Sequence, residues 1–184
     1  MSDVVSSPPE WRVSQWFNTR TPIALADLRG KVVVLHTFQM LCPGCVAHGL
    51  PQAQRVRDYF GAEDVVVIGL HTVFEHHDVM TPEALGAFIH EYHWTFPIGV
   101  DEPSGKAAVP HTMAAYQMRG TPSLLLFDRA GRLRWHHFGR PDDLMVGAKI
   151  MALVVEGRAG ALEEDQRPEP GGAGCSEDGC PVPG

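Results

Sequence analysis

Several apolar stretches along the chain predict the strands of a sheet. Residues 31–38, K-V-V-V-L-H-T-F, and residues 64–70, D-V-V-V-I-G-L, are continuous runs rich in β-branched residues. Such runs are typical of strands that are buried on both faces. A short strand is expected over residues 96–100. Near the end, S-L-L-L-F-D, the turn D-R-A-G and R-L-R-W-H-H-F-G predict an antiparallel hairpin.

Helices are predicted between and after these strands. The first covers residues 46–60, and Pro51 should kink it because proline has no N–H for the helical ladder. Thr81-Pro82-Glu83 starts the second, with Thr81 as the N-cap, and this helix should end at about His93. A brief helix is expected around residues 111–118 and a last one over 142–156. The side chains expected to face the core are Leu50, Val56 and Phe60 in the first helix and Leu144, Ile150, Met151 and Val154 in the last.

The predicted order of elements is β-α-β-α-β-α-β-β-α. Strands that alternate with helices indicate an α/β fold, in which a central, mainly parallel sheet has helices on both faces and is closed by the hairpin. We expect an N-terminal lead-in over residues 1–21 and one domain over 22–157. Residues 158–184 are rich in Gly, Pro and acidic residues, which predicts a flexible tail.

Composition and charge narrow the classes of function. The chain has 184 residues, is 44% hydrophobic and carries a net charge of −7, so nothing favours nucleic-acid binding, which needs a basic face. No apolar run approaches the roughly 20 residues of a membrane span, and the N-terminus lacks the pattern of a secretory signal. We therefore expect a cytoplasmic protein, without membrane or nucleic-acid partners, and a monomer.

The motif C-P-G-C places Cys42 and Cys45 between a buried strand and the start of a helix. A helix N-terminus favours a thiolate, so Cys42 is expected to be the nucleophile, and Cys45 one turn later is placed to resolve a mixed disulfide. A zinc site would need a second pair of ligands, and two buried cysteines without chemistry are the remaining reading. The spacing at a strand–helix junction favours redox exchange over both.

At this point the sequence resembles the thioredoxin superfamily, in its TlpA/ResA-like branch. The resemblance covers about residues 22–157 and rests on K-V-V-V-L-H-T-F with C-P-G-C, on V-I-G-L-H-T-V-F-E with F-P-I-G-V-D, and on G-T-P-S-L-L-L-F-D-R-A-G-R-L. The segments G-L-H-T-V-F-E-H-H-D and W-H-H-F-G are also similar to the thioredoxin-like domains attached to DipZ and NHL-repeat proteins. The resemblance implies a thioredoxin-like fold.

The resemblance also implies roles for single residues. Cys42 matches the attacking cysteine and Cys45 the resolving one. Pro122 matches the cis-proline that faces them, and the backbone at Thr121 is expected to pair with bound substrate. Glu75 matches an acid near the resolving cysteine that accepts its proton, although a solvated loop acid is an equal alternative. Where the family usually has tryptophan before the first cysteine, this chain has Leu41.

The expected function is thiol–disulfide exchange with protein disulfides or dithiols, supported by an upstream reductant. No cofactor is expected beyond the Cys42–Cys45 disulfide itself, and no metal. One rival is a peroxiredoxin-like thiol peroxidase, but Gln39 and Leu35 stand where that class needs a hydroxyl residue and a proline. The other is a Sco-like copper-binding protein, since two thiolates and an imidazole suit copper, although that class uses a C-x-x-x-C spacing.

The tail contains a second pair of cysteines, Cys175 and Cys180. Core packing does not explain them in a segment of Gly, Ser, Glu and Asp. One hypothesis makes them a second redox pair that exchanges with Cys42 and Cys45. The alternative is a disordered tail whose thiols have no such role.

Overall fold

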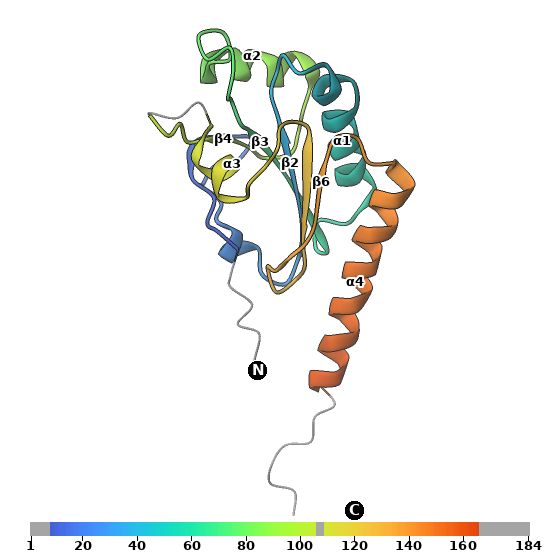
Figure 1. Cartoon of the computed structure of the whole chain (residues 1–184). Coiled ribbons are helices and arrows are strands. Elements are labelled where there is room, and N and C mark those ends of the chain that lie inside the picture. The colour runs from blue at the N-terminus through green and yellow to red at the C-terminus, as the bar shows by residue number, and fades with distance from the viewer. Residues whose placement is uncertain (1–7, 106–108, 166–184) are drawn as a thin grey trace, which may run out of the picture.

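The computed structural model shows a six-stranded mixed sheet with helices on both faces (Figure 1). It describes residues 8–105 and 109–165, with side chains up to Gly157. The sheet order is β1-β4-β3-β2-β5-β6, with β2, β3 and β4 parallel and the other pairs antiparallel. The strands are β1 (Val13–Phe17), β2 (Val32–Phe38), β3 (Val65–His71), β4 (Ile98–Asp101), β5 (Ser123–Phe127) and β6 (Leu133–Phe138).

Alternate side chains of β2 divide the core into two layers. Val32, Val34 and Phe38 point to the face covered by α1, α2 and α4, and Val33 and Leu35 to the face covered by η1 and α3. This alternation is the period of two of a strand buried on both sides. The helices are η1 (Leu25–Leu28), α1 (Leu50–Tyr59), α2 (Pro82–Tyr92), α3 (His111–Ala115) and α4 (Asp143–Asp165). The predicted fold class is therefore confirmed, and Thr81 caps α2 through a bond from the Ala84 N–H.

The structure contains a strand that the sequence did not predict. It lies within the expected lead-in over residues 1–21 and is absent from the predicted order of elements. β1 lies in this segment and pairs with β4 in antiparallel fashion at the edge of the sheet. Its five residues are exposed or only half-buried. An edge strand of this kind needs no continuous apolar run, so the pattern that revealed β2 and β3 did not reveal it.

The last helix differs from its prediction in both register and length. Ile150 and Val154 are buried as expected, but Leu144 is 82% exposed and Met151 47% exposed. α4 also continues to Asp165, eight residues into the expected tail over 158–184. The sequence R-A-G-A-L-E-E-D contains mostly strong helix formers, which outweigh the helix-breaking tendency of its glycine.

Where a kink was predicted at Pro51, the structure has a π-helical turn, η2, over Cys45–Gly49, shortly before the proline. The Leu50 N–H donates to the carbonyl of Cys45, five residues earlier. Pro51 then occupies the first turn of α1, where its missing N–H is not needed. Insertions of this kind are a recognised cause of bends within helices and often occur at functional sites.

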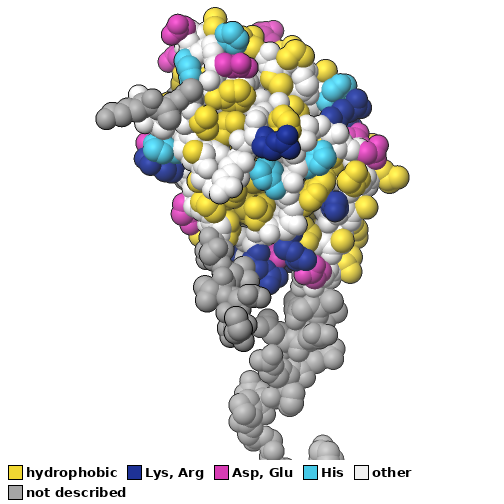
Figure 2. Space-filling view, in the orientation of Figure 1, with side chains coloured by type: hydrophobic (Ala, Val, Ile, Leu, Met, Phe, Trp, Pro, Cys, Tyr) yellow, Lys and Arg dark blue, Asp and Glu magenta, His cyan; other side chains and the backbone are white. Residues whose placement is uncertain are grey.

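The outer surface shows no concentration of one charge on the face seen in Figure 2, where basic, acidic and apolar side chains are interspersed. Among the helices of residues 8–105 and 109–165, none combines the length and apolarity needed to cross a bilayer.

Candidate active site

The two cysteines of the C-P-G-C motif lie shortly after the end of β2. The chain turns at Gln39, whose carbonyl accepts the Cys42 N–H at 3.2 Å, and then enters the helix. The Cys45 N–H approaches both the carbonyl and the Sγ of Cys42, at 3.0 and 3.3 Å. Both cysteines are free thiols in the structure. Cys42, the nucleophile predicted from the motif, therefore lies where the chain passes from the strand into the helix.

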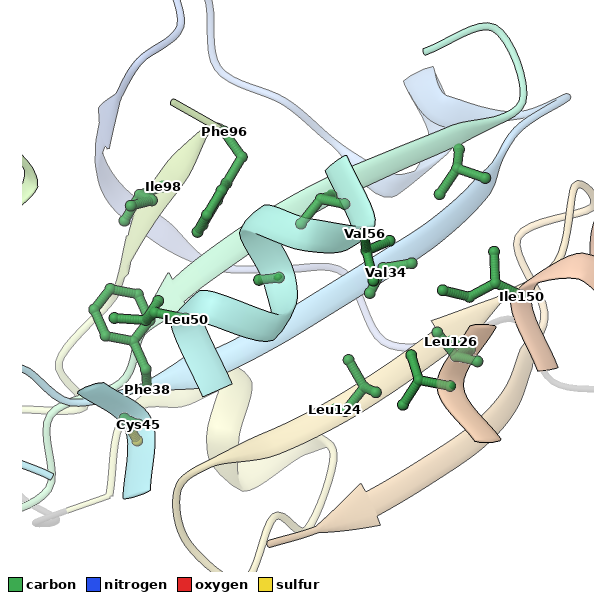
Figure 3. Packing of buried hydrophobic residues seen from close by; sticks show 14 of the residues in the cluster. Val34, Phe38, Cys45, Leu50, Val56, Phe96, Ile98, Leu124, Leu126 and Ile150 are labelled. Carbon is green, nitrogen blue, oxygen red and sulfur yellow. The ribbon is translucent and has the colours of Figure 1, made fainter. Parts of the chain in front are cut away.

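The environments of the two sulfurs differ. Cys42 is half-buried, whereas Cys45 is fully buried and packs with Phe38 and Leu50 under the start of α1 (Figure 3). Burial, and to a lesser extent the hydrogen bond to Cys42, raise the pKa of Cys45 to about 12. Contacts with the Gln39 backbone and the Thr121 side chain partly oppose this increase in the Cys45 pKa. Cys45 is therefore protonated near neutral pH and must lose a proton before it attacks.

Thr121 and Pro122 lie against the cysteine pair, at the start of β5. The peptide bond between them is cis. The Cys42 thiol donates to the Thr121 carbonyl at 3.6 Å, and a Cβ added at Gly44 would lie 3.4 Å from the Pro122 Cδ. This proximity follows from the antiparallel pairing of β2 and β5, in which Thr37 faces Ser123, so that the end of one strand meets the beginning of the other.

Glu75 lies in the loop between β3 and α2 and is exposed. Its carboxylate accepts a hydrogen bond from the Gln39 side-chain amide at 3.4 Å. The backbone of Gln39 in turn contacts the Cys45 sulfur. The structure thus brings Glu75 to the edge of the site with Gln39 between it and Cys45.

Two buried histidines next to the site were not singled out from the sequence. His36 on β2 and His71 on β3 are 1% and 0% exposed, and burial lowers the pKa of each to about 4. The His36 ring packs against the helix, since a Cβ added at Gly49 would lie 2.5 Å from its Cε1. The sequence signal for His36 was a polar residue within an otherwise apolar strand.

The remaining predicted residues do not join this site. Leu41, in the place of the usual tryptophan, is 59% exposed beside Cys42. Cys175 and Cys180 lie outside the described residues. Within the part of the chain that is described, no three His, Cys, Asp or Glu side chains gather as ligands for a metal ion.

Comparisons with known proteins identify the family and the fold. A model of the AhpC/TSA family matches residues 9–136. A crystal structure of a thioredoxin-like superfamily protein is 61% identical, with a TM-score of 0.79, and the alignment covers 80% of this chain and 96% of that one. The structure of a thiol-disulfide isomerase from Corynebacterium glutamicum is 49% identical, also with a TM-score of 0.79, and covers 83% of this chain and 98% of that one.

Two curated relatives are similar over shorter parts of their length. The thiol:disulfide interchange protein DsbE of Xylella fastidiosa is 25% identical over 141 residues, which are 73% of this chain and 60% of that protein. NHL repeat-containing protein 2 of Gallus gallus is 43% identical over 60 residues, 32% of this chain and 8% of that protein. The chain therefore spans less than two thirds of either relative. Because the family model spans most of the chain, the chain belongs to the AhpC/TSA family, and its fold is thioredoxin-like.

Proposed function

We propose that the protein exchanges electrons with protein disulfides through the dithiol of Cys42 and Cys45. The observation that carries the proposal is the unequal burial of the two thiols beside the cis-proline. Cys42 is accessible to a substrate, and Cys45 is enclosed next to it. This is the arrangement that separates attack from resolution.

The exchange has two steps. The Cys42 thiolate attacks a substrate disulfide, forms a mixed disulfide, and releases one substrate sulfur as a thiolate that takes a proton. Cys45 then loses its proton and attacks the Cys42 sulfur, which breaks the mixed disulfide and releases the second substrate thiol. The substrate disulfide is reduced to two thiols, while Cys42 and Cys45 are oxidised to one disulfide. An upstream dithiol reductant reverses this oxidation.

Substrate docking is assigned to the surface around Cys42. The backbone at Thr121 and Pro122 lies at the beginning of β5, where an extended substrate segment is able to add main-chain hydrogen bonds. Leu41 adds an exposed apolar side chain next to the nucleophile. We therefore propose substrates that present a disulfide in an extended, partly apolar segment.

Insulin reduction with dithiothreitol tests the proposal. The wild-type chain should accelerate the reaction, and Cys42→Ser or Cys45→Ser should abolish the acceleration. The double variant Cys175→Ser/Cys180→Ser separates the active pair from the tail pair: retained activity is expected if the tail thiols have no part in catalysis. Wild-type activity that survives Cys42→Ser would refute the assignment.

Thiol peroxidase activity is the second candidate, favoured by the match to the AhpC/TSA family model. The residue three positions before Cys42 is Gln39, whose amide is engaged by the Phe74 N–H and by Glu75. No hydroxyl is provided there to orient a peroxide. We therefore expect hydroperoxide turnover to be slow beside insulin reduction. Fast peroxide turnover that persists in Cys45→Ser would favour the peroxidase.

The physiological direction is proposed to be reduction, in the cytoplasm. Equilibration of the Cys42–Cys45 pair with glutathione buffers would measure its potential. A value near that of thioredoxin, about −270 mV, supports a reductant, whereas a value near −120 mV identifies an oxidant. Trapping with Cys45→Ser in whole cells would then isolate the partner as a mixed disulfide.

A further inference from the structure

Gln39 has a fully enclosed side chain at the end of β2, where only 1% of the residue is exposed. A buried amide must form hydrogen bonds, because an unsatisfied one costs about 1–3 kcal/mol. Its Oε1 accepts the Phe74 N–H at 3.2 Å, and its Nε2 donates to Glu75 Oε1 at 3.4 Å. Both partners belong to the loop between β3 and α2. The side chain therefore ties this loop to the end of β2.

The backbone of the same residue contacts both cysteines. The Gln39 carbonyl accepts the Cys42 N–H at 3.2 Å. Its backbone also bonds to the Cys45 sulfur, a contact that acts to lower the Cys45 pKa. Gln39 thus touches the nucleophile, the resolving thiol and the exposed carboxylate of Glu75 at the same time.

The resolving step needs a proton acceptor at this place. Three effects raise the Cys45 pKa: burial, a hydrogen bond to Cys42 and the charge interaction with Cys42. The last two are lost when Cys42 enters a mixed disulfide. Deprotonation of Cys45 then becomes easier, and a nearby carboxylate is suited to accept the proton.

We infer that Gln39 is a positioning residue that holds the Glu75 carboxylate beside the cysteine pair for the resolving step. The inference rests on the proposed function. Cys45 passes its proton to the Glu75 carboxylate by way of a water molecule at this edge of the site, while its sulfur bonds to Cys42; the Cys42–substrate bond breaks, and the departing thiolate takes up a proton. Gln39 itself neither gains nor loses a proton and acts through Glu75.

Stopped-flow mixing with 5,5′-dithiobis(2-nitrobenzoate) separates the two chemical steps. Attack by Cys42 releases a first thionitrobenzoate in a phase that depends on reagent concentration. Attack by Cys45 releases a second in a phase that does not. The full chain would carry Cys175→Ser and Cys180→Ser, so that only the active pair reacts.

Gln39→Met keeps the approximate size of the side chain and removes the amide. It should slow the second phase about tenfold at neutral pH and leave the first unchanged, and Glu75→Gln should do the same. The double variant should be no slower than either single variant, because both changes remove the same interaction. The pH profile of the second-phase rate should change in the same way in both single variants.

Gln52→Met is the matched control, because Gln52 is also a buried amide, 5% exposed, but bonds to the Pro141 carbonyl and to Asp143. It should change neither phase. If Gln39→Met is too unstable to assay, Gln39→Glu keeps the acceptor for the Phe74 N–H, places a second carboxylate against Glu75, and should also slow the second phase.

Two results would overturn the inference: multiplicative slowing in the double variant, or a Gln39→Met second phase and pH profile equal to those of the Gln52→Met control. Failure of the proposed function has a different signature. In that case the wild-type chain would release only one thionitrobenzoate, and no second phase would exist to compare.

Discussion

At the scale of single residues, the two thiols of the site differ in exposure although they share one helical turn. Cys42 is half-buried and bonds to a backbone carbonyl, whereas Cys45 is enclosed and its pKa is raised to about 12 by burial and by its bond to Cys42. The local motif is nearly symmetric. The asymmetry comes from the core beneath it.

Alkylation of the reduced chain checks this asymmetry. With substoichiometric iodoacetamide at neutral pH, Cys42 should be modified first, and Cys45 should react only after unfolding, since a buried thiol is poorly accessible and remains protonated. Peptide mapping identifies the modified residue. Prior modification of Cys45 would reverse the assigned roles.

Gly49 is a second residue whose identity is dictated by its surroundings. An added Cβ would lie 2.5 Å from the His36 ring and 3.2 Å from Pro122. Gly49→Ala should therefore destabilise the fold by about 1–3 kcal/mol, measured by urea unfolding.

The matched control for Gly49→Ala is Gly147→Ala in α4, where an added Cβ meets nothing within 4 Å. That change should stabilise the protein by about 0.5–1 kcal/mol, the ordinary preference of a helix for alanine. Equal effects at the two positions would contradict the crowding at Gly49.

At the scale of elements, α4 has apolar residues on two faces, and only one of them meets the sheet. Ile150 is fully buried, and its neighbour Met151 is 47% exposed. Ile150→Ala should lower the free energy of unfolding by about 2–5 kcal/mol, whereas Met151→Ala should change it by less than about 0.5 kcal/mol. Urea midpoints of the two variants provide the measurement. Similar losses would mean that the helix packs in the register first expected from the sequence.

The limits of prediction are visible in the same elements. β2 and β3 follow from their continuous apolar runs because a strand buried on both faces needs such a run. β1 was missed because an edge strand leaves its side chains half in water. The register of α4 was wrong because its two apolar faces are equivalent until the sheet selects one.

The candidate site also contains residues that local motifs predict and residues that they do not. Cys42, Cys45 and Pro122 belong to short local motifs, and the structure brings them together. The role inferred for Gln39 depends on a partner 36 residues away, which no local spacing reveals. Tertiary contacts, rather than the motif, determine this part of the site.

At the scale of the whole molecule, acid should weaken the fold before the carboxylates titrate. Burial lowers the pKa of His36 and of His71 to about 4, below the value of about 6.5 in an unfolded chain. The unfolded state then binds protons first as the pH falls. The contribution that each neutral, buried histidine makes to the free energy of unfolding is fully present above about pH 6.5. About 3 kcal/mol for each histidine is lost as the pH falls towards 4.

Urea unfolding between pH 7 and pH 4.5 measures this loss. His71→Leu should reduce the slope of unfolding free energy against pH by up to about 1.4 kcal/mol per unit, the effect of one proton. Identical slopes for the wild type and His71→Leu would show that the fold does not lower the pKa of His71.

The bond between Cys42 and the Thr121 carbonyl joins residues 79 positions apart. A ribosome must therefore have synthesised most of the domain before the proposed nucleophile meets the proposed docking surface. A nascent or partly opened chain would contain both thiols of the motif but lack the surface proposed to bind a protein substrate. Under the proposed function, selectivity for protein disulfides is consequently a property of the completed fold, and separation of β5 from β2 is expected to leave a chain that reacts with small disulfides indiscriminately.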